Sequence, residues 1–473
     1  MGIMSLSQKE VINALRKGKV TICVVGLGRI GLPQAALFAD RGAHVIGADV
    51  DPAVVECVNS GRSHLLDEPG LDRLVMSATN SGRLKATVDT SLGVEAADFV
   101  IVSVPTPISA KRIPDYSQME EACHAIAKTL PKDCLIIIES TVGPGAVEDF
   151  VIPLLEEEAK MEVCVDFGVA SCPERADPGG LLRDLTTVPR IVGGINDKSA
   201  EIARALYREI FGVEVVVVSD PKTANAAKLA ENLFRDVNIA LVSEFALLYE
   251  KLGIDAIEVI DACSTKYNFM PHYPSAGVGG PCLPQNPYFL IYEGMKAGYI
   301  PRMVQMARQI NDDTPKRAVA MATMALRRIN KKAESSKIAI LGVTYKPNIR
   351  DLQHTPVEKI FISLKEIGAT LKLYDPMFRD EEVFGKRISR SVEEAVRDAD
   401  CILIGTAHDE FRNLDLDLLR ERCNMPAVFA DIANISDPSI VEEHGFTYAG
   451  IRKPEKSWSL REEEDSLQCT ASQ

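Results

Sequence analysis

Cys282 differs from the other cysteines of the chain in its sequence surroundings. The stretch GVGGPCLPQNPYFLI, residues 277–291, places its thiol between a glycine cluster and two prolines. Glycine permits backbone conformations that other residues avoid, and proline stiffens the chain, so a tight loop is predicted here. A thiol on such a loop can serve as a nucleophile, whereas a cysteine in apolar surroundings is inert. The stretch alone leaves both interpretations of Cys282 open.

The remaining cysteines and the histidines indicate neither a disulfide framework nor a metal site. The chain has 11 cysteines, an odd number, without CxxC spacing, and its seven histidines form no HExxH sequence. We therefore expect no metal ion. Cys23, Cys134 and Cys401 lie in apolar, strand-like runs and are interpreted as small buried residues, which leaves Cys282 as the exception.

A second chemical signal is the sequence GLGRIG, which follows the apolar run TICVV and opens a helical stretch. In that context Gly26 allows a tight turn, Gly28 lets a pyrophosphate approach the backbone, and Gly31 lets helix pack on strand. The helix N-terminus adds N–H donors and a positive partial charge. Asp49 ends the next strand, where a carboxylate can accept from both ribose hydroxyls, and Asp51 competes for this role. No arginine follows closely, so NAD is predicted rather than NADP.

The elements that must position these residues are strands alternating with helices. Apolar runs of strand length recur between longer helical stretches, first up to about residue 220 and again from residue 337. This rhythm predicts βα units, parallel sheets and right-handed crossovers. The runs are 20–28, 44–50, 98–105, 134–141, 167–174, 189–194 and 213–220, followed by 337–347, 369–376, 400–408 and 426–434.

A long helix is predicted between the two alternating regions. Asp220 and Pro221 form a good helix start, because a carboxylate can cap the first turn and proline suits the first helical position. The sequence then continues without proline or glycine as far as Gly253. A helix of about thirty residues that is apolar over much of its circumference should link two domains and pack against another subunit. We therefore expect a homodimer or a larger homo-oligomer.

The expected fold class is α/β, with two Rossmann-like doubly wound parallel-sheet domains joined by a central long-helix domain. At roughly 100–200 residues per domain, 473 residues suit this plan. The dinucleotide-binding domain is placed at residues 1–220, the helical domain at 221–330 and the second doubly wound domain at 331–452. Residues 453–473 are polar and charged, so this tail is expected to be disordered.

Composition and charge exclude several classes of function. Hydrophobic residues make up 46% of the chain and charged residues 25%, as in an ordinary globular protein. No apolar run approaches the ~20 residues that span a bilayer, and the N-terminus lacks the apolar core of a signal peptide, so a cytoplasmic protein without a membrane partner is expected. The formal net charge of −14 argues against nucleic acid as a partner.

Seven short motifs, taken in order, give the chain a specific resemblance. From about residue 18 to 450 it resembles the nucleotide-sugar 6-dehydrogenases, NAD-dependent enzymes that oxidise C6 of a UDP-sugar twice, from alcohol to carboxylate. CPER followed by Asp177, and GVGG before the cysteine, resemble the branch that acts on UDP-N-acetylhexosamines, especially UDP-N-acetylmannosamine. The motifs are GLGRIGLP at 26–33, VPTP at 104–107, ESTVGPG at 139–145, CPER at 172–175, KLAEN at 228–232, GVGGPC at 277–282 and GVTYKP at 342–347.

The resemblance implies that Cys282 is the nucleophile of the second oxidation. An aldehyde must become a tetrahedral adduct before it can lose a hydride, and a thiolate makes that adduct and leaves a thioester for water to hydrolyse. Gly279 and Gly280 would let backbone crowd the substrate. The uridine diphosphate is expected to bind the third domain around Tyr345 and Lys346.

The resemblance also assigns roles to four polar residues. Lys228 and Asn232 are four residues apart on the long helix, so they share a face, and they would stabilise the reacting oxygen. A solvated lysine is the alternative for Lys228. Thr141 would hold the hydrolytic water and Glu174 would act on it, although Glu174 alone could be a helix-entry or salt-bridge residue. The implied cofactor site is Gly26, Gly28, Arg29, Ile30, Gly31, Asp49, Pro105, Thr106 and Thr141, and the implied substrate site is Glu174, Arg175, Lys228, Asn232, Gly279, Gly280, Tyr345 and Lys346.

Several positions depart from the family pattern, among them Ser275, where glycine is usual. Gln285 and Asn286 stand where the family usually has a lysine and an aspartate, and an amide cannot take a proton from water. Gln353 stands where an arginine is common, and Arg350 is a candidate substitute. The alternatives are therefore a UDP-glucose 6-dehydrogenase, a nucleotide-sugar-binding relative that has lost the full reaction, and a single-step hydroxyacid dehydrogenase.

Overall fold

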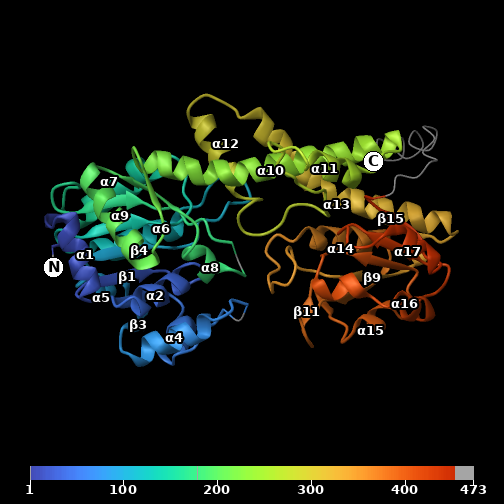
Figure 1. Ribbon diagram of the computed structural model, residues 1–473, viewed down its shortest axis with the longest axis horizontal. Coiled ribbons are helices and arrows are strands. Elements are labelled where there is room, and N and C mark those ends of the chain that lie inside the picture. The colour runs from blue at the N-terminus through green and yellow to red at the C-terminus, as the bar shows by residue number, and fades with distance from the viewer. Residues whose placement is uncertain (1, 66, 178, 453–473) are drawn as a thin grey trace. The chain divides into compact units, whose positions relative to one another are not determined.

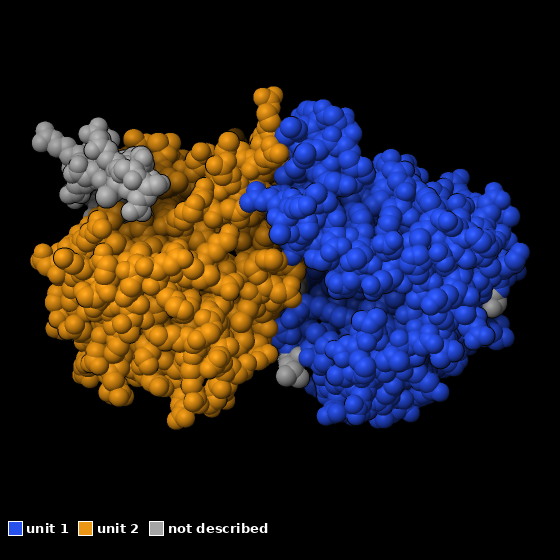
Figure 2. Space-filling view, turned by 180° about the vertical axis from the view of Figure 1, so that it is seen from behind, with its two compact units in different colours: residues 1–232, 285–301 blue, residues 233–284, 302–473 orange. Residues whose placement is uncertain are grey.

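The computed structural model describes residues 2–65, 67–177 and 179–452. The tail predicted to be disordered, residues 453–473, lies outside the described residues. The described residues form two compact units, one within residues 2–232 and 285–301 and the other within residues 233–284 and 302–452 (Figure 2).

The first unit is built on an eight-stranded sheet in the order β3-β2-β1-β4-β5-β6-β7-β8. Neighbouring strands are parallel except β6 and β7, which pair antiparallel. A parallel neighbour needs a long crossover, usually through a helix, and the link between β6 and β7 contains only the five-residue helix α8, Leu181–Leu185. The strands are β1 (Thr21–Val25), β2 (His44–Ala48), β3 (Leu84–Thr87), β4 (Phe99–Val102), β5 (Leu135–Ile138), β6 (Gly168–Ser171), β7 (Arg190–Gly194) and β8 (Val215–Val218).

Helices cover both faces of this sheet, which explains the continuous apolar runs in its strands (Figure 1). Ile22 and Val24 of β1 belong to the core under α1, α2, α4 and α9, whereas Cys23 and Val25 belong to the core under α5, α6 and α7. The helices of this unit include α1 (Gln8–Arg16), α2 (Gly31–Asp40), α3 (Pro52–Asn59), α4 (Leu71–Asn80), α5 (Thr90–Val94), α6 (Ser117–Ala127), α7 (Ile152–Ala159), α9 (Asp197–Phe211) and α12 (Asn286–Lys296).

The long helix predicted after Asp220 is present as α10, Pro221–Leu252, with 32 residues. The Asp220 carboxylate accepts a hydrogen bond from the Thr223 N–H at 2.7 Å, which caps the first turn. Gly253 follows the last helical residue with φ +72°, a left-handed conformation that commonly ends helices. The boundary between the compact units falls inside α10, after Asn232, whereas the sequence-based division is placed at residue 220.

The second unit contains a five-stranded parallel sheet in the order β10-β9-β13-β14-β15. Ile338 and Ile340 of β9 belong to the core under α13 and α14, and Ala339 and Leu341 belong to the core under α15, α16 and α17. A second doubly wound sheet is therefore present, as predicted. Its elements are α11 (Ala256–Cys263), α13 (Arg302–Arg328), β9 (Lys337–Leu341), α14 (Pro356–Ile367), β10 (Thr370–Tyr374), β11 (Glu382–Val383), β12 (Lys386–Arg387), α15 (Val392–Val396), β13 (Cys401–Ile404), α16 (Leu416–Arg422), β14 (Val428–Asp431), α17 (Pro438–Glu443) and β15 (Thr447–Gly450).

The turn after β1 is closed by what we call an aspartate clasp. The Gly26 N–H donates to the Ala48 carbonyl at 2.8 Å, and the Leu27 N–H donates to Asp49 Oδ2 at 2.8 Å. The other Asp49 oxygen accepts from the Asp51 N–H at 2.9 Å. The carboxylate at the end of β2 thus fixes the backbone that leaves β1.

The turn after β9 is closed by the same clasp. The Gly342 N–H donates to the Tyr374 carbonyl at 2.8 Å, and the Val343 N–H donates to Asp375 Oδ2 at 2.7 Å. Asp375 Oδ1 accepts from the Met377 N–H at 2.9 Å. In this unit, however, no helix follows directly, because residues 344–355 form a loop before α14.

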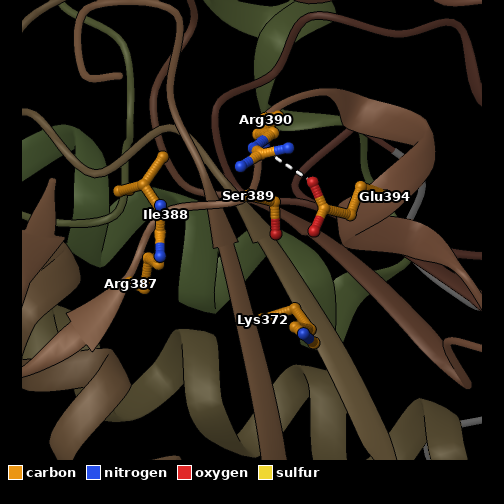
Figure 3. A pocket seen from close by; sticks show the side chains of 6 residues that line it. All are labelled: Lys372, Arg387, Ile388, Ser389, Arg390 and Glu394. Atoms are coloured by element: carbon orange, nitrogen blue, oxygen red, sulfur yellow. Dashed lines mark hydrogen bonds between the residues drawn. The ribbon is translucent and has the colours of Figure 1, made fainter. Parts of the chain in front are cut away.

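Two shallow pockets indent the second unit beside β10 and the β11–β12 hairpin. In the smaller one, of about 220 Å³, the Arg390 N–H donates to Glu394 Oε2 at 2.8 Å (Figure 3). Arg387 and Arg390 also pair with Asp380 at 3.2 and 3.5 Å, which offsets much of their charge. Neither pocket is lined by a residue of the predicted active site.

Candidate active site

The three glycines of the turn after β1 meet three different packing requirements. Gly26 has φ +92°, and a Cβ there would lie 2.3 Å from the Ser103 carbonyl oxygen. A Cβ on Gly31 would lie 1.8 Å from the Gly26 oxygen. A Cβ on Gly28, in contrast, would have no heavy atom within 4 Å, and Gly28 is exposed. The open space lies at the residue where a pyrophosphate must approach the backbone, so the turn fits a dinucleotide.

Asp49 is the better placed of the two candidates for a ribose. Its carboxylate binds the Leu27 N–H and therefore lies against the glycine turn. Asp51 instead caps α3, because its Oδ1 accepts from the Ala53 N–H at 2.8 Å. Each Asp49 oxygen accepts one backbone N–H, and a carboxylate has about four acceptor positions, so two remain for hydroxyl groups.

Arg29 and Ile30 lie where the turn enters α2. Ile30 is the residue before the first helical residue. Arg29 Nη1 contacts Asp67 Oδ2 at 2.9 Å and Glu68 Oε1 at 3.9 Å. Glu68 in turn accepts from the Gly179 N–H at 2.7 Å, so the glycine turn is connected through these side chains to the segment after β6.

The segments after β4 and β5 are joined by two hydroxyl groups. Thr106 Oγ1 donates to the Thr141 carbonyl at 2.6 Å, and Ser140 Oγ donates to the Val104 carbonyl at 2.7 Å. Thr141 is half-buried and Pro105 is exposed. These residues follow the carboxyl ends of β4, which pairs with β1, and of β5, which pairs with β4, and ligands bind at this edge of such sheets.

Lys228 and Asn232 present two buried donors on one face of α10. Each side chain is only 8% exposed. Asn232 Nδ2 has no hydrogen-bond partner among the described residues. Lys228 likewise has no ion pair or hydrogen bond with another described residue. Buried donors without acceptors are costly, so this face of α10 is suited to a ligand oxygen.

Glu174 is held by four donors. Its Oε1 accepts from the N–H groups of Arg175 at 2.6 Å and Ala176 at 2.7 Å. Its Oε2 accepts from Gln34 Nε2 at 2.9 Å and from the buried Arg190 at 2.8 Å. Burial acts to raise the pKa of Glu174, but Arg190, the two N–H groups and Lys228 outweigh it and lower the pKa below its ordinary value.

A second buried carboxyl group, Glu139, lies beside Glu174 and was not identified from the sequence. Its oxygens accept from the Tyr207 hydroxyl and from Gln34 Nε2, and Arg190 Nη1 lies 3.9 Å away. Burial raises the pKa of Glu139 to about 7, with Glu174 adding to the effect and Arg190 opposing it. Two buried carboxyl groups therefore share one arginine, and Glu139 is the one that retains a proton more easily.

Arg175 pairs with a carboxylate of α10. Its Nε lies 3.0 Å and its Nη2 2.5 Å from the two Glu231 oxygens, and its Nη1 donates to the Pro189 carbonyl at 2.5 Å. A bidentate pair of this kind fixes the guanidinium plane. Arg175 is thereby held beside the helix that carries the two unpaired donors.

The loop that carries Cys282 packs on Tyr345 within the second unit. A Cβ on Gly279 would lie 2.6 Å from Tyr345 Cβ, and a Cβ on Gly280 would lie 2.7 Å from its ring. The Gly280 N–H donates to the Gln353 carbonyl at 2.9 Å. Glycine is therefore required at these two positions because Tyr345 packs against them, and not only to let a substrate approach. The loop that follows β9 and the loop that precedes Cys282 therefore pack against each other.

Cys282 is exposed, as a nucleophile must be. The interpretation of Cys282 as the exception was too narrow, because Cys164 and Cys263 are exposed as well. Cys23 and Cys134 are buried as predicted, and burial raises the pKa of Cys23 to about 12. Cys282 is distinguished by its glycine-rich loop and not by exposure alone.

The residues that depart from the family pattern have identifiable surroundings in the structure. Asn286 is buried at the start of α12, and its Nδ2 has no partner among the described residues. Gln285 Oε1 accepts from the Ile108 N–H at 3.1 Å. Arg350, considered as a substitute for an arginine at position 353, pairs with Glu381 at 2.6 Å.

The described chain contains no group of three His, Cys, Asp or Glu side chains that could hold a metal ion.

Three family models match the chain in the order expected from the motifs. The NAD binding domain of the UDP-glucose/GDP-mannose dehydrogenase family matches residues 20–211. The central domain of that family matches residues 222–313, and its UDP binding domain matches residues 339–438. The chain belongs to the UDP-glucose/GDP-mannose dehydrogenase family. As a family member it is an oxidoreductase whose cofactor is NAD.

Individual relatives are similar over most of the chain. A UDP-N-acetyl-D-mannosamine dehydrogenase from Pyrococcus horikoshii is 35% identical, covering 91% of this chain and 98% of the relative. An NDP-N-acetyl-D-galactosaminuronic acid dehydrogenase from Ralstonia nicotianae is 34% identical over 85% of this chain and 94% of the relative. The solved structure of the UDP-D-ManNAc dehydrogenase from Pyrococcus horikoshii superposes with a TM-score of 0.86 at 35% identity, covering 92% of this chain and all of that one.

The residues predicted for the site fall in both compact units. Lys228, Asn232, Thr141, Glu174 and the glycine turn belong to the first unit. Cys282, Tyr345 and Lys346 belong to the second. No helix in the described part of the chain is long and apolar enough to cross a bilayer.

Proposed function

We propose that this dehydrogenase oxidises C6 of a UDP-N-acetylhexosamine to the carboxylate, with UDP-N-acetyl-D-mannosamine as the preferred substrate. The names of the similar proteins from Pyrococcus horikoshii and Ralstonia nicotianae support an N-acetylated sugar. The single observation that carries the chemistry is the pair of buried, unpartnered donors Lys228 and Asn232 on one face of α10. Such a pair is suited to an oxygen that gains negative charge during the reaction.

The first oxidation converts the C6 alcohol to an aldehyde. C6 loses a hydride and its hydroxyl loses a proton, and Lys228 and Asn232 donate to the oxygen as it becomes an alkoxide. The glycine turn would hold NAD, with Asp49 available to its ribose hydroxyls, and NAD would supply the hydride acceptor, one molecule for each oxidation. Pro105, Thr106 and the other cofactor residues shape the same edge of the sheet.

The second oxidation proceeds through Cys282. The thiolate adds to the aldehyde carbon, the new C–S bond replaces the carbonyl π bond, and the oxygen is again held by Lys228 and Asn232. Loss of the second hydride from this alkoxide restores the carbonyl bond and leaves a thioester. Water then attacks, the C–S bond breaks, and the thiol and the carboxylate are released.

Thr141 is assigned to holding the hydrolytic water, whereas Glu174 receives a different role from the one expected. Both Glu174 oxygens already accept two donors each, and its pKa is lowered. A carboxylate in this state is a weak proton acceptor. We assign Glu174 to orienting Arg190 and the segment of Arg175, and to balancing the charge of Lys228.

The test of this function is the number of NADH molecules formed per sugar, followed at 340 nm. The wild-type enzyme is expected to form two NADH per UDP-N-acetyl-D-mannosamine, and Cys282→Ser is expected to stop after one. The matched control is Cys263→Ser, which removes another exposed thiol of the same unit and should still form two. One NADH from the wild type, or two from Cys282→Ser, would contradict the proposal.

A substrate panel separates the alternatives. A UDP-glucose dehydrogenase from Pyrobaculum islandicum superposes with a TM-score of 0.81 at 26% identity, so UDP-glucose is the second candidate. A relative that has lost the full reaction through Asn286 and Gln285 would bind the sugar without forming two NADH. We expect the highest kcat/KM with UDP-N-acetyl-D-mannosamine.

We further propose that the enzyme works as a homodimer or larger homo-oligomer in the cytoplasm, with the division at residues 220 and 330 as its functional domains. Apolar side chains exposed along α10 support association, because contiguous apolar surface of this kind is usually covered. They are Phe234, Leu241, Phe245, Leu247, Leu248 and Leu252.

A further inference from the structure

The loop after β9 is bound to the segment after β13 by a set of hydrogen bonds that we call the tether. Thr406 Oγ1 donates to the Thr344 carbonyl at 2.6 Å, and the Asn348 N–H donates to His408 Nδ1 at 3.0 Å. Asn348 Nδ2 donates to Asp409 Oδ2 at 2.8 Å, and the Asp409 N–H donates back to Asn348 Oδ1 at 3.2 Å. The tether therefore holds both ends of the segment that carries Tyr345 and Lys346.

His408 is the centre of the tether and is completely buried. Because Nδ1 accepts from the Asn348 N–H, the ring proton resides on Nε2. Nε2 lies 3.0 Å from Asp375 Oδ2 and 3.1 Å from Thr344 Oγ1, both acceptors for that proton. The imidazole thus joins the clasp carboxylate to the loop backbone, and Asn348 is held with φ +60°, a conformation that few residues other than glycine adopt.

The first unit contains the same clasp, but there no described histidine is hydrogen-bonded to the aspartate. Asp49 closes its turn with two backbone N–H groups, and although the His64 imidazole is close enough to interact with its charge, Asp49 accepts no hydrogen bond from an imidazole among the described residues. The strand registers place Thr106 at the position equivalent to His408, and its hydroxyl donates to the Thr141 carbonyl instead. His408 is therefore not required to close the turn of a sheet of this kind. Its distinct contribution is the bond to Asn348.

We propose that His408 is a positioning residue that fixes residues 344–348 for the uridine diphosphate moiety of the substrate. The inference rests on the proposed function, because it takes the loop of Tyr345 and Lys346 to bind that moiety. His408 touches neither substrate nor cofactor, and acts only by holding the loop backbone.

Two substitutions separate the bonds of the imidazole. In His408→Asn the side-chain oxygen can take the place of Nδ1 and accept from the Asn348 N–H, but the contact with Asp375 is lost. In His408→Gln the amide can reach Asp375, but the Asn348 N–H loses its acceptor. The proposal predicts that His408→Gln raises the Kd of UDP and the KM of the UDP-sugar about tenfold, and that His408→Asn stays within about twofold of wild type. The Kd of NAD and kcat should be unchanged in both.

The measurement is titration calorimetry of the full-length chain with UDP alone and, separately, with NAD, supported by steady-state kinetics. Equal UDP affinity in the two variants, or parallel losses of UDP and NAD affinity, would show a merely structural role and overturn the inference. If His408→Gln does not fold, Thr406→Val takes its place, because it removes a different bond of the tether, and it should raise the Kd of UDP several-fold. An unchanged Kd in Thr406→Val would also overturn the inference.

Failure of the proposed function has a different signature. In that case wild-type protein would not bind UDP, or would not form two NADH from any UDP-sugar. If the wild type binds UDP and His408→Gln binds it equally well, only the role of His408 is contradicted.

Discussion

Replacing Glu139 by glutamine should remove a loss of stability that the wild-type protein suffers as the pH rises. Glu139 is buried next to the Glu174 carboxylate, and burial raises its pKa to about 7 from an ordinary value of 4.5. A carboxyl group whose pKa is higher in the folded than in the unfolded state stabilises the fold fully below pH 4.5. That stabilisation is lost as the pH rises through 7.

The magnitude follows from the two pKa values. They differ by about 2.5 pH units, and at about 1.36 kcal/mol per unit the wild type should lose on the order of 3 kcal/mol between pH 4.5 and 7. Glutamine remains neutral throughout, and its amide can donate to Gln34 Oε1, which has no partner among the described residues. The pKa of Glu174 is lowered, so its own contribution is lost only as the pH falls below 4.5, outside this window.

The assay is urea-induced unfolding of wild type and Glu139→Gln at half-unit steps from pH 5 to pH 8. The free energy of unfolding of the variant relative to wild type should rise by about 3 kcal/mol over this range and then level off. Glu157→Gln, at an exposed position of α7, is the matched control for the removal of one glutamate. A constant difference between Glu139→Gln and wild type would refute the reasoning that burial raises the pKa of Glu139.

Four further substitutions test other parts of the molecule. Lys228→Met should lower kcat about 10²- to 10³-fold with little change in the Kd of NAD, measured by steady-state kinetics and titration, because it removes a donor to the reacting oxygen. Gly26→Ala should abolish NAD binding but leave UDP binding intact, since its Cβ would meet the Ser103 carbonyl. Gly280→Ala should do the opposite, raising the Kd of UDP at least several-fold, because its Cβ would meet the Tyr345 ring. Leu248→Glu should shift the protein toward monomer in light scattering, and an unchanged mass would contradict the assignment of α10 as an interface.

The strands buried on both faces could be predicted from the sequence, whereas two of the four edge strands, β3 and β15, could not. β4 and β5 are continuous apolar runs because all four of their residues are buried. The edge strand β3 has the sequence LKAT with one buried residue, so it lacks a pattern of its own. β15 was not predicted from the sequence either. The antiparallel pairing of β6 with β7 depends on the path of the connection between them, which the local hydrophobic pattern does not indicate.

The candidate site was predictable where its residues are close in sequence. Spacing alone placed Lys228 and Asn232 on one face, and the glycine turn and its acid followed from a known motif. The network of Gln34, Glu139 and Glu174 with Arg190 could not be predicted, because its members come from distant segments and each is an ordinary polar residue taken alone. The same holds for His408, which lies in the sequence GTAHDEF with no metal or catalytic spacing.

The aspartate clasp has a consequence for how such an enzyme can change. Its donors are the backbone N–H groups of Val343 and Met377, and its acceptor is the side chain of Asp375. Substitutions in the loop of residues 344–355 leave all three in place. The contacts proposed for the uridine diphosphate moiety can therefore change by mutation of that loop while the turn beneath it stays closed.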